Sequence, residues 1–298
     1  MLKCFLSIIF FILLFVNSTL PQTLTERYNK LGEMFVVQLS TSPFPHVDRI
    51  TGHIYNNKTY SAGEHYSDSS VAIFIPKGFK PKNRTDFVVY FHGWYNNIDS
   101  ACNKFRLIEQ FSESKKNAIF VFPEGPKNAP DSFGGKLEER YGLKYLMADV
   151  IQYLKLKNKI KSDEIGRIIL AGHSGAYRVI SFCLMHGGLT QNISDIILFD
   201  ALYGQIDKYI HWITNFDGRF IDIYTDNGGT KSETERMINF LEINNINFIE
   251  TEEAKLTLTE LKKNRLIFIH SDLTHNEVIS KRNQFRNYLI SSKLDNLR

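Results

Sequence analysis

The stretch Arg167–Ser181, RIILAGHSGAYRVIS, decides how the rest of the chain is interpreted. Its apolar run Ile168–Ala171 predicts a buried strand, and a helical pattern directly follows the motif Gly172-His-Ser-Gly-Ala176. A strand that turns sharply into a helix strains the backbone of its central residue, here Ser174, and exposes that side chain at the end of the sheet. Small residues belong two positions before and after this serine, and the motif supplies glycine and alanine there. The stretch therefore predicts a nucleophile elbow; a tight turn that carries a solvated serine is the alternative.

Length and composition limit the classes of protein to consider. A chain of 298 residues is long enough for one large α/β domain or two small ones, and its 43% hydrophobic residues are ordinary for a globular protein with a full core. The net charge is +4, with the two signs interspersed and no basic block. We therefore expect no nucleic-acid partner.

The first 18 residues are predicted to be a signal peptide. Lys3 supplies a positive start, Cys4–Val16 is an apolar run too short to span a bilayer comfortably, and Val16-Asn-Ser18 offers small residues for cleavage. This predicts a secreted or periplasmic protein without a stable membrane anchor. An uncleaved N-terminal anchor is the alternative.

The remaining cysteines, Cys102 and Cys183, fall on predicted helices that cover opposite faces of the proposed sheet. We expect two buried thiols, although an oxidising compartment permits a disulfide. The sequence contains neither C-x-x-C nor H-E-x-x-H, so no metal and no cofactor are predicted.

Short apolar runs predict strands, and from residue 87 onward they alternate with helical patterns. The predicted strands are residues 71–76, 87–91, 118–122, 168–171, 196–200, 220–224, 247–250 and 266–270. This alternation predicts an α/β fold: a mostly parallel twisted sheet with helices on both faces, a three-layer sandwich. Residues 19–70 are expected to form an extension and first strands, with a hairpin within residues 47–60, and residues 71–298 the core.

Several ionisable side chains follow predicted strands, at the edge where sites form in open α/β sheets. They are His92, Ser174, Asp200, Asp226, Asp272 and His275. A serine hydroxyl becomes a nucleophile when a base takes its proton and a third group orients that base. His275, beyond the last strand, is the predicted base for Ser174, and His270 within that strand is its rival. The other interpretation of His275 is a surface or helix-capping residue.

The elbow, the His92-Gly93 pair after an earlier strand and the late histidine together resemble the α/β-hydrolase superfamily. The resemblance covers roughly residues 71–290, and Ala176 departs from the glycine usual at that position. The strand at 71–76, a polar loop and the run FVVYFHG at 87–93 are similar to secreted esterases of the feruloyl, acetylxylan and polyester-depolymerase kind. The resemblance implies a triad in the order serine, acid, histidine.

Two aspartates compete for the role of triad acid. Asp226 follows the second strand after the elbow, the commonest place for the acid in the superfamily, but it lies in an Asp-Asn-Gly-Gly turn where aspartate also serves local hydrogen bonding. Asp200 follows the strand immediately after the elbow, a rarer place, and stands alone after four apolar residues. We prefer Asp226 slightly and keep Asp200 as the alternative acid.

The resemblance also implies an oxyanion hole made by the amides of Trp94 and Gly175. His92 is expected to be structural rather than chemical. Trp94 and Tyr95 are predicted to contact substrate, and Lys136, on a long loop, to meet an anionic substrate group. The alternatives are partly buried core aromatics and an ordinary surface loop.

The combined prediction is a secreted serine hydrolase that cleaves a carboxylic ester through an acyl-enzyme. Its expected partner is a small-molecule or polymer-bound ester, and the protein is expected to be a monomer. A serine peptidase or amidase on the same fold, and a non-catalytic binding protein on a hydrolase scaffold, are the alternatives.

Overall fold

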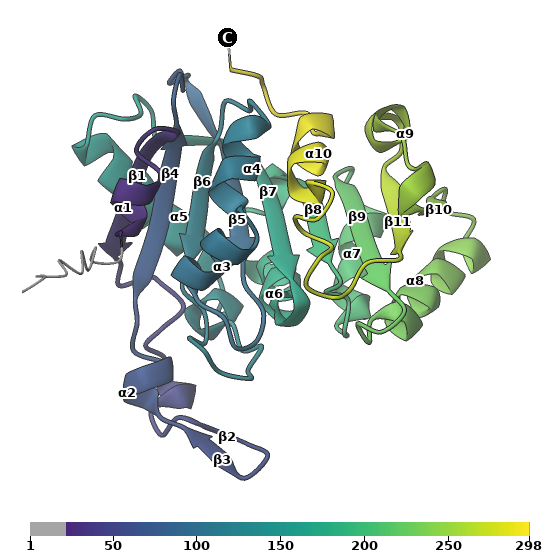
Figure 1. Cartoon of the computed structure of the whole chain (residues 1–298), viewed down its shortest axis with the longest axis horizontal. Coiled ribbons are helices and arrows are strands. Elements are labelled where there is room, and N and C mark those ends of the chain that lie inside the picture. The colour runs from purple at the N-terminus through teal and green to yellow at the C-terminus, as the bar shows by residue number, and fades with distance from the viewer. Residues whose placement is uncertain (1–21, 298) are drawn as a thin grey trace, which may run out of the picture.

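The computed structural model describes residues 22–297, and the predicted signal peptide, residues 1–18, lies outside them. Within the described residues, nine strands form one sheet in the order β1-β4-β6-β5-β7-β8-β9-β11-β10 (Figure 1). Strand β4 runs antiparallel to both of its neighbours, and the other neighbouring pairs are parallel. The predicted mostly parallel sheet is confirmed.

The strands have the following bounds. In the order of the sheet they are β1 (Gly32–Gln38), β4 (Ser70–Pro76), β6 (Ile119–Pro123), β5 (Arg84–Phe91), β7 (Glu164–His173), β8 (Ile193–Phe199), β9 (Arg219–Thr225), β11 (Leu266–Ser271) and β10 (Ile249–Glu252). A separate hairpin consists of β2 (His53–Tyr55) and β3 (Lys58–Tyr60).

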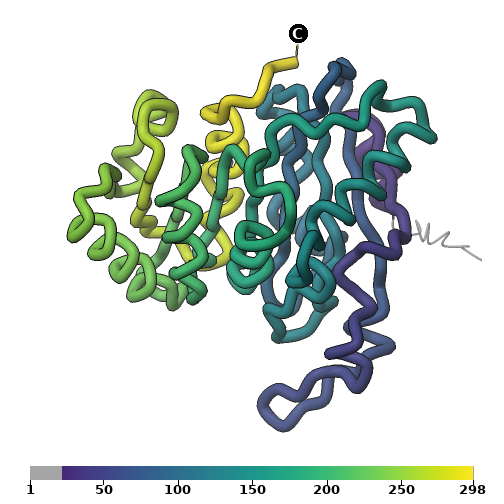
Figure 2. The backbone as a smooth tube through the Cα atoms, turned by 180° about the vertical axis from the view of Figure 1, so that it is seen from behind, coloured from purple at the N-terminus to yellow at the C-terminus, as the bar shows by residue number. Residues whose placement is uncertain are grey.

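Helices cover both faces of the sheet, as Figures 1 and 2 show. On one face, apolar side chains of α3 (Ile98–Lys104), α4 (Leu107–Glu113), α9 (Leu258–Lys263) and α10 (Gln284–Ser291) are buried. On the other face, those of α5 (Gly142–Leu156), α6 (Tyr177–His186), α7 (Ile206–Asn215) and α8 (Lys231–Ile243) are buried. The short helices are α1 (Leu24–Arg27), α2 (Ala62–His65), η1 (Val47–Arg49), η2 (Gly135–Glu138), η3 (Ser174–Ala176), η4 (Thr190–Asn192) and η5 (Glu253–Lys255).

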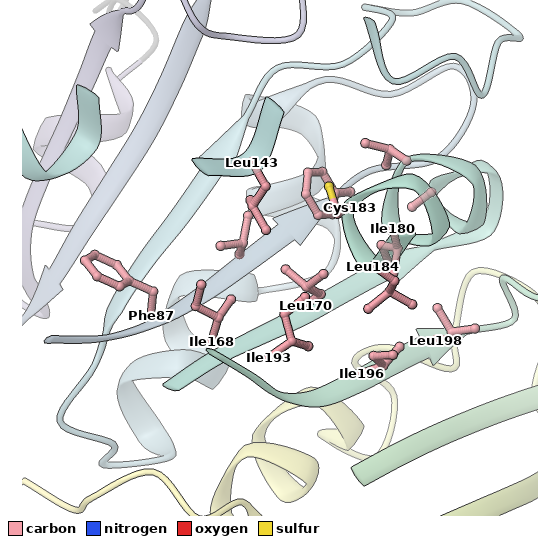
Figure 3. Packing of buried hydrophobic residues seen from close by; sticks show 14 of the residues in the cluster. Phe87, Leu143, Ile168, Leu170, Ile180, Cys183, Leu184, Ile193, Ile196 and Leu198 are labelled. Atoms are coloured by element: carbon pink, nitrogen blue, oxygen red, sulfur yellow. The ribbon is translucent and has the colours of Figure 1, made fainter. Parts of the chain in front are cut away.

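The central strands are apolar throughout because both of their faces are covered. In Figure 3, Leu170 of β7 and Leu198 of β8 lie beneath Ile180 and Leu184 of α6. Burying each such side chain stabilises the fold by about 1.5–3 kcal/mol relative to leaving it in water. Cys102 and Cys183 are free, buried thiols in the clusters on opposite faces, as predicted. Among the described residues, no helix is both long and apolar enough to cross a membrane.

The order of the strands reverses between β5 and β7. From β5 the chain moves outward to β6, and it then returns past β5 to form β7 on the other side. Loops that leave neighbouring strands in opposite directions at such a point open a crevice at the carboxyl edge of the sheet. The loop after β5 and the elbow after β7 therefore lie side by side.

Residues 39–69, between β1 and β4, leave the sheet as an arm that carries the β2–β3 hairpin and α2. The arm projects beyond the rest of the molecule on the side where the parallel strands end (Figures 1 and 2). The hairpin expected within residues 47–60 is present. Within the predicted extension, residues 32–38 join the sheet as its edge strand β1, in register with β4.

Candidate active site

The elbow has the backbone conformation that the sequence predicts. Ser174 follows β7 with φ of 55°, in the left-handed region that costs a non-glycine residue on the order of 1–3 kcal/mol. A methyl group at Gly172 would lie 2.6 Å from Cβ of Ala176 and 2.7 Å from Cδ1 of Ile180. The absence of a side chain at position 172 therefore makes room for the alanine that departs from the usual motif, and the turn keeps its shape.

His275 and Asp200 form the hydrogen-bonded pair at this edge. Nδ1 of His275 donates to Oδ2 of Asp200 at 2.8 Å, which leaves Nε2 as the ring nitrogen that can take a proton. The Asp200 side chain is fully buried and also accepts hydrogen bonds from the hydroxyls of Thr225 (2.8 Å) and Thr230. Burial opposes ionisation of this carboxyl, but the bonds from His275, Thr230 and Thr225 outweigh it and hold its pKa below the usual value.

Asp226 does not orient His275, so our preference for it is corrected. Its exposed carboxylate is paired with Lys231 at 2.9 Å and with His270 at 3.1 Å. The turn that contains Asp226 instead surrounds the other aspartate: a methyl group at Gly228 would lie 1.6 Å from Oδ2 of Asp200. Gly228 of the turn thus allows the close approach to Asp200.

His270, the rival base, lies away from the elbow. Its Nδ1 is 3.0 Å from Oε2 of Glu252, on the neighbouring edge strand β10, and its Nε2 faces Asp226. These two carboxylates raise the pKa of His270 against the opposing effect of its partial burial. A histidine held between two carboxylates is well suited to an ion pair and poorly placed as a base for Ser174.

His173 holds the backbone of His275, a contact that the sequence did not reveal. Its Nε2 donates to the backbone carbonyl of His275 at 2.9 Å, and the two rings lie 4.4 Å apart. Burial, with the His275 ring beside it, lowers the pKa of His173 to about 3. The His173 ring is therefore neutral. Its single N–H holds the loop that carries His275 close to the end of β7, directly before Ser174.

The predicted oxyanion loop lies directly against the elbow. A methyl group at Gly93 would be 2.6 Å from Cβ of Ser174 and 3.1 Å from the amide nitrogen of Gly175. Within residues 22–297, the amide of Trp94 donates to no protein acceptor. This arrangement leaves the Trp94 amide available beside Ser174, where the resemblance predicts an oxyanion hole.

His92 and Glu124 form a buried pair behind the oxyanion loop. Nε2 of His92 is 2.9 Å from Oε1 of Glu124, and Nδ1 donates to the carbonyl of Gly93 at 2.7 Å. The other oxygen of Glu124 accepts the amide of Ile98 at the start of α3. The ring of His92 therefore connects the loop after β5 to the loop after β6, which fits the structural role expected for it.

The side chain of Trp94 packs on the elbow. Its Nε1 donates to Oγ of Ser132 at 2.8 Å, and a methyl group at Gly175 would lie within 3 Å of both side chains. Ser132 lies on the long loop after β6, so this loop lines the site, as its length suggested. Lys136 of the same loop does not reach the site, because its ammonium donates to the carbonyl of Ser40 at 2.8 Å.

Tyr203 is a further residue of the site that the sequence analysis missed. Its hydroxyl donates to the carbonyl of Gly228, and its ring lies edge-on to His275 with the centroids 6.3 Å apart. Burial, together with the charge of Asp200, raises the pKa of Tyr203 to about 12, while the nearby Ser174 hydroxyl has the opposite, smaller effect. Tyr203 therefore remains a neutral phenol that bounds the site.

A cleft of about 950 Å³ lies at the opposite edge of the sheet, away from these groups. It is lined mainly by polar residues, and its charged side chains include the paired Arg84, bound to Glu164, and Lys82, bound to Asp295. Size alone therefore does not identify the candidate site, which is marked by the hydrogen-bonded His275 and Asp200 and by the strained backbone of Ser174.

Comparison with known proteins agrees with this geometry at the level of the fold. No protein-family model and no curated protein matches the sequence. The feruloyl esterase module of Clostridium thermocellum, solved with sinapinate, has a TM-score of 0.54 at 12% identity over 88% of both chains. The fluorophosphonate-binding serine hydrolase FphF of Staphylococcus aureus has a TM-score of 0.54 at 9% identity over 87% of this chain and 99% of its own. The chain therefore has the α/β-hydrolase fold that these two proteins share.

Proposed function

We propose that the protein hydrolyses carboxylic esters, with Ser174 as the nucleophile, His275 as the general base and Asp200 as the acid that orients it. The observation that carries the proposal is the buried carboxylate of Asp200, hydrogen-bonded to His275 at 2.8 Å beside a serine with left-handed backbone. The likeness of the fold to serine esterases supports the same chemistry.

The reaction proceeds in two halves. Oγ of Ser174 attacks the ester carbonyl carbon while Nε2 of His275 takes the hydroxyl proton, and the amides of Trp94 and Gly175 stabilise the charge on the carbonyl oxygen. The carbon–oxygen bond to the alcohol then breaks, and His275 returns the proton to the departing alcohol. Water repeats the sequence on the acyl-serine and releases the acid. Asp200 remains ionised and stabilises the imidazolium in both halves.

Labelling with a fluorophosphonate tests for an activated serine. Wild type should react covalently, and Ser174→Ala and His275→Ala should each lose labelling while keeping the circular dichroism of the folded protein. Absence of labelling in folded wild type would contradict the proposal and favour a binding protein on this scaffold. A panel of matched esters and amides then separates an esterase from a peptidase or amidase.

We propose further that residues 1–18 direct secretion or export to the periplasm and are removed. The expected N-terminus of the exported chain follows the small residues at 16–18. Mass spectrometry of the exported protein checks this, and recovery of the full chain from a membrane fraction would support an uncleaved anchor instead.

A further inference from the structure

The arm formed by residues 39–69 is fastened to the active-site loop at several points. Arg49 of the arm forms an ion pair with the mostly buried Asp131 at 2.7 Å, and its guanidinium lies 4.5 Å from the ring of Phe133. The amide of Lys136 donates to the carbonyl of Pro43, and that of Lys127 to the carbonyl of His65. These contacts hold the arm as a fixed wall beside the site.

The hairpin of the arm turns one face toward the oxyanion loop. Strand residues alternate between faces, so Tyr55 and its register partner Lys58 share one face while Ile54 points to the other. The ring of Tyr55 lies 5.2 Å from that of Trp94, edge to face. On the same side, Tyr60 lies 6.3 Å from Tyr95.

The rings of Trp94 and Tyr95 are only partly covered by their neighbours and remain accessible to solvent. Trp94 is 39% exposed and Tyr95 is 57% exposed, although Trp94 also packs on the elbow at Gly175. The ammonium of Lys58 lies 4.9 Å from the Tyr60 ring and has no carboxylate partner among the described residues. An exposed aromatic surface with an adjoining cation therefore begins at Trp94, whose ring packs on the residue that follows the proposed nucleophile.

We propose that Tyr55, Trp94 and Tyr95 form a subsite for a ring, aromatic or pyranose, that carries polar groups and belongs to the ester substrate. Ring faces pack favourably on aromatic side chains, and Lys58 adds a donor for hydroxyl or carboxylate substituents. A plain alkyl chain uses the rings but not the cation, so it fits this surface less well. The proposal rests on the proposed function, because the subsite is useful only beside a reacting ester.

Binding to Ser174→Ala protein tests the subsite separately from catalysis. Trp94 and Trp212 are the two tryptophans, and Trp212 is fully buried, so quenching of tryptophan fluorescence by a soluble ligand reports on Trp94. The probes are 4-acetoxybenzoate, which carries an aromatic ring, methyl 6-O-acetylglucopyranoside, which carries a pyranose, and ethyl acetate. Saturable quenching by either ring-bearing probe, but not by ethyl acetate, is expected, and the probe that binds identifies the kind of ring.

Two variants of the same hairpin provide the comparison. In the Ser174→Ala background, Tyr55→Ala should weaken binding of the ring-bearing probe by about fivefold to tenfold, as loss of one aromatic contact predicts. Ile54→Ala, on the opposite face, should bind it as the parent does. In the active enzyme, Tyr55→Ala should raise KM for the ring-bearing ester far more than for ethyl acetate.

Quenching that is equal for all three probes, or equal losses in Tyr55→Ala and Ile54→Ala, would overturn the subsite. Failure of the proposed function has a different signature, because wild type would then not react with fluorophosphonate whatever the probes bind.

Discussion

At the scale of single residues, the two competing aspartates differ in burial and in partners. Asp200 is fully buried and accepts hydrogen bonds from His275 and two threonines, whereas Asp226 is exposed and paired with Lys231 and His270. A buried carboxylate that accepts a hydrogen bond from Nδ1 of His275 fixes the tautomer of that ring and stabilises its charged form. The exposed carboxylate of Asp226, which pairs with other residues, has neither effect on His275.

Replacing each aspartate by asparagine should therefore separate their roles. Asp200→Asn is expected to lower kcat for ester hydrolysis by about 10³–10⁴-fold, because an amide cannot stabilise the imidazolium and favours the wrong tautomer. Asp226→Asn should stay within about twofold of wild type, since surface pairs contribute little. Steady-state kinetics on a simple ester measures both. Equal losses in the two variants, or a loss confined to Asp226→Asn, would return the role of the acid to Asp226.

The sequence could locate part of the candidate site but not the carboxylate that bonds to His275. Ser174 and His275 were identifiable because strand ends and turn residues mark their positions locally. The choice of acid depends on the direction of a side chain after β8 and on the approach of Gly228, which the chain brings together only when folded. His173 and Tyr203 were missed for a similar reason: each donates to a backbone carbonyl far along the chain, and no residue pattern records such a partner.

At the scale of elements, the strands that the sequence predicted are buried on both faces or bounded by clear turns. The sequence predicted first strands within residues 19–70 but did not locate β1, because it is an edge strand with a partly exposed, alternating pattern whose conformation depends on pairing with β4. The arm was predicted as a hairpin from its turn residues, but its attachment through Arg49 and Asp131 joins segments 82 residues apart. Local patterns therefore identified the elements, and long-range contacts determined where the arm lies.

The elbow offers a prediction at this scale. Gly172→Ala should destabilise the fold by about 1–3 kcal/mol, because the new methyl group meets the side chains of Ala176 and Ile180 at less than 3 Å. Ala176→Gly removes one of the two clashes, so the double variant should recover part of the lost stability. Urea unfolding of the single and double variants measures the coupling between the two positions. Strict additivity of the two changes would show that the alanine methyl is not what requires glycine at position 172.

At the scale of the whole molecule, the sheet buries a second carboxylate behind the proposed triad. Asp222 of β9 is fully buried, and Oδ2 accepts a hydrogen bond from Thr234 at 2.6 Å, while Oδ1 has no partner among the described residues. Burial, followed by the charge of Asp200, raises its pKa from 3.8 to about 7. The core on that side therefore contains an acid group that prefers to be protonated.

This group makes the stability of the whole fold depend on pH. Because the folded state binds the proton of Asp222 more tightly than the unfolded state, the contribution of Asp222 to the free energy of unfolding should fall as pH rises from about 4 to about 7 and then level off. The lowered pKa of His173 acts in the opposite sense over part of this range, so the difference between wild type and a variant of Asp222 isolates the effect. Asp222→Asn removes the titration, but its amide leaves a buried donor unpaired, so a net gain of about 1–3 kcal/mol is expected at pH 8 and none at pH 4. Urea unfolding of wild type and variant at several pH values measures the difference. Asp163→Asn, which changes an exposed carboxylate paired with Lys155, is the control and should leave this dependence between pH 5 and pH 8 in place. A variant that is no more stable than wild type at pH 8 would mean that Asp222 is ionised at little cost, and that water or a partner reaches Oδ1 in solution.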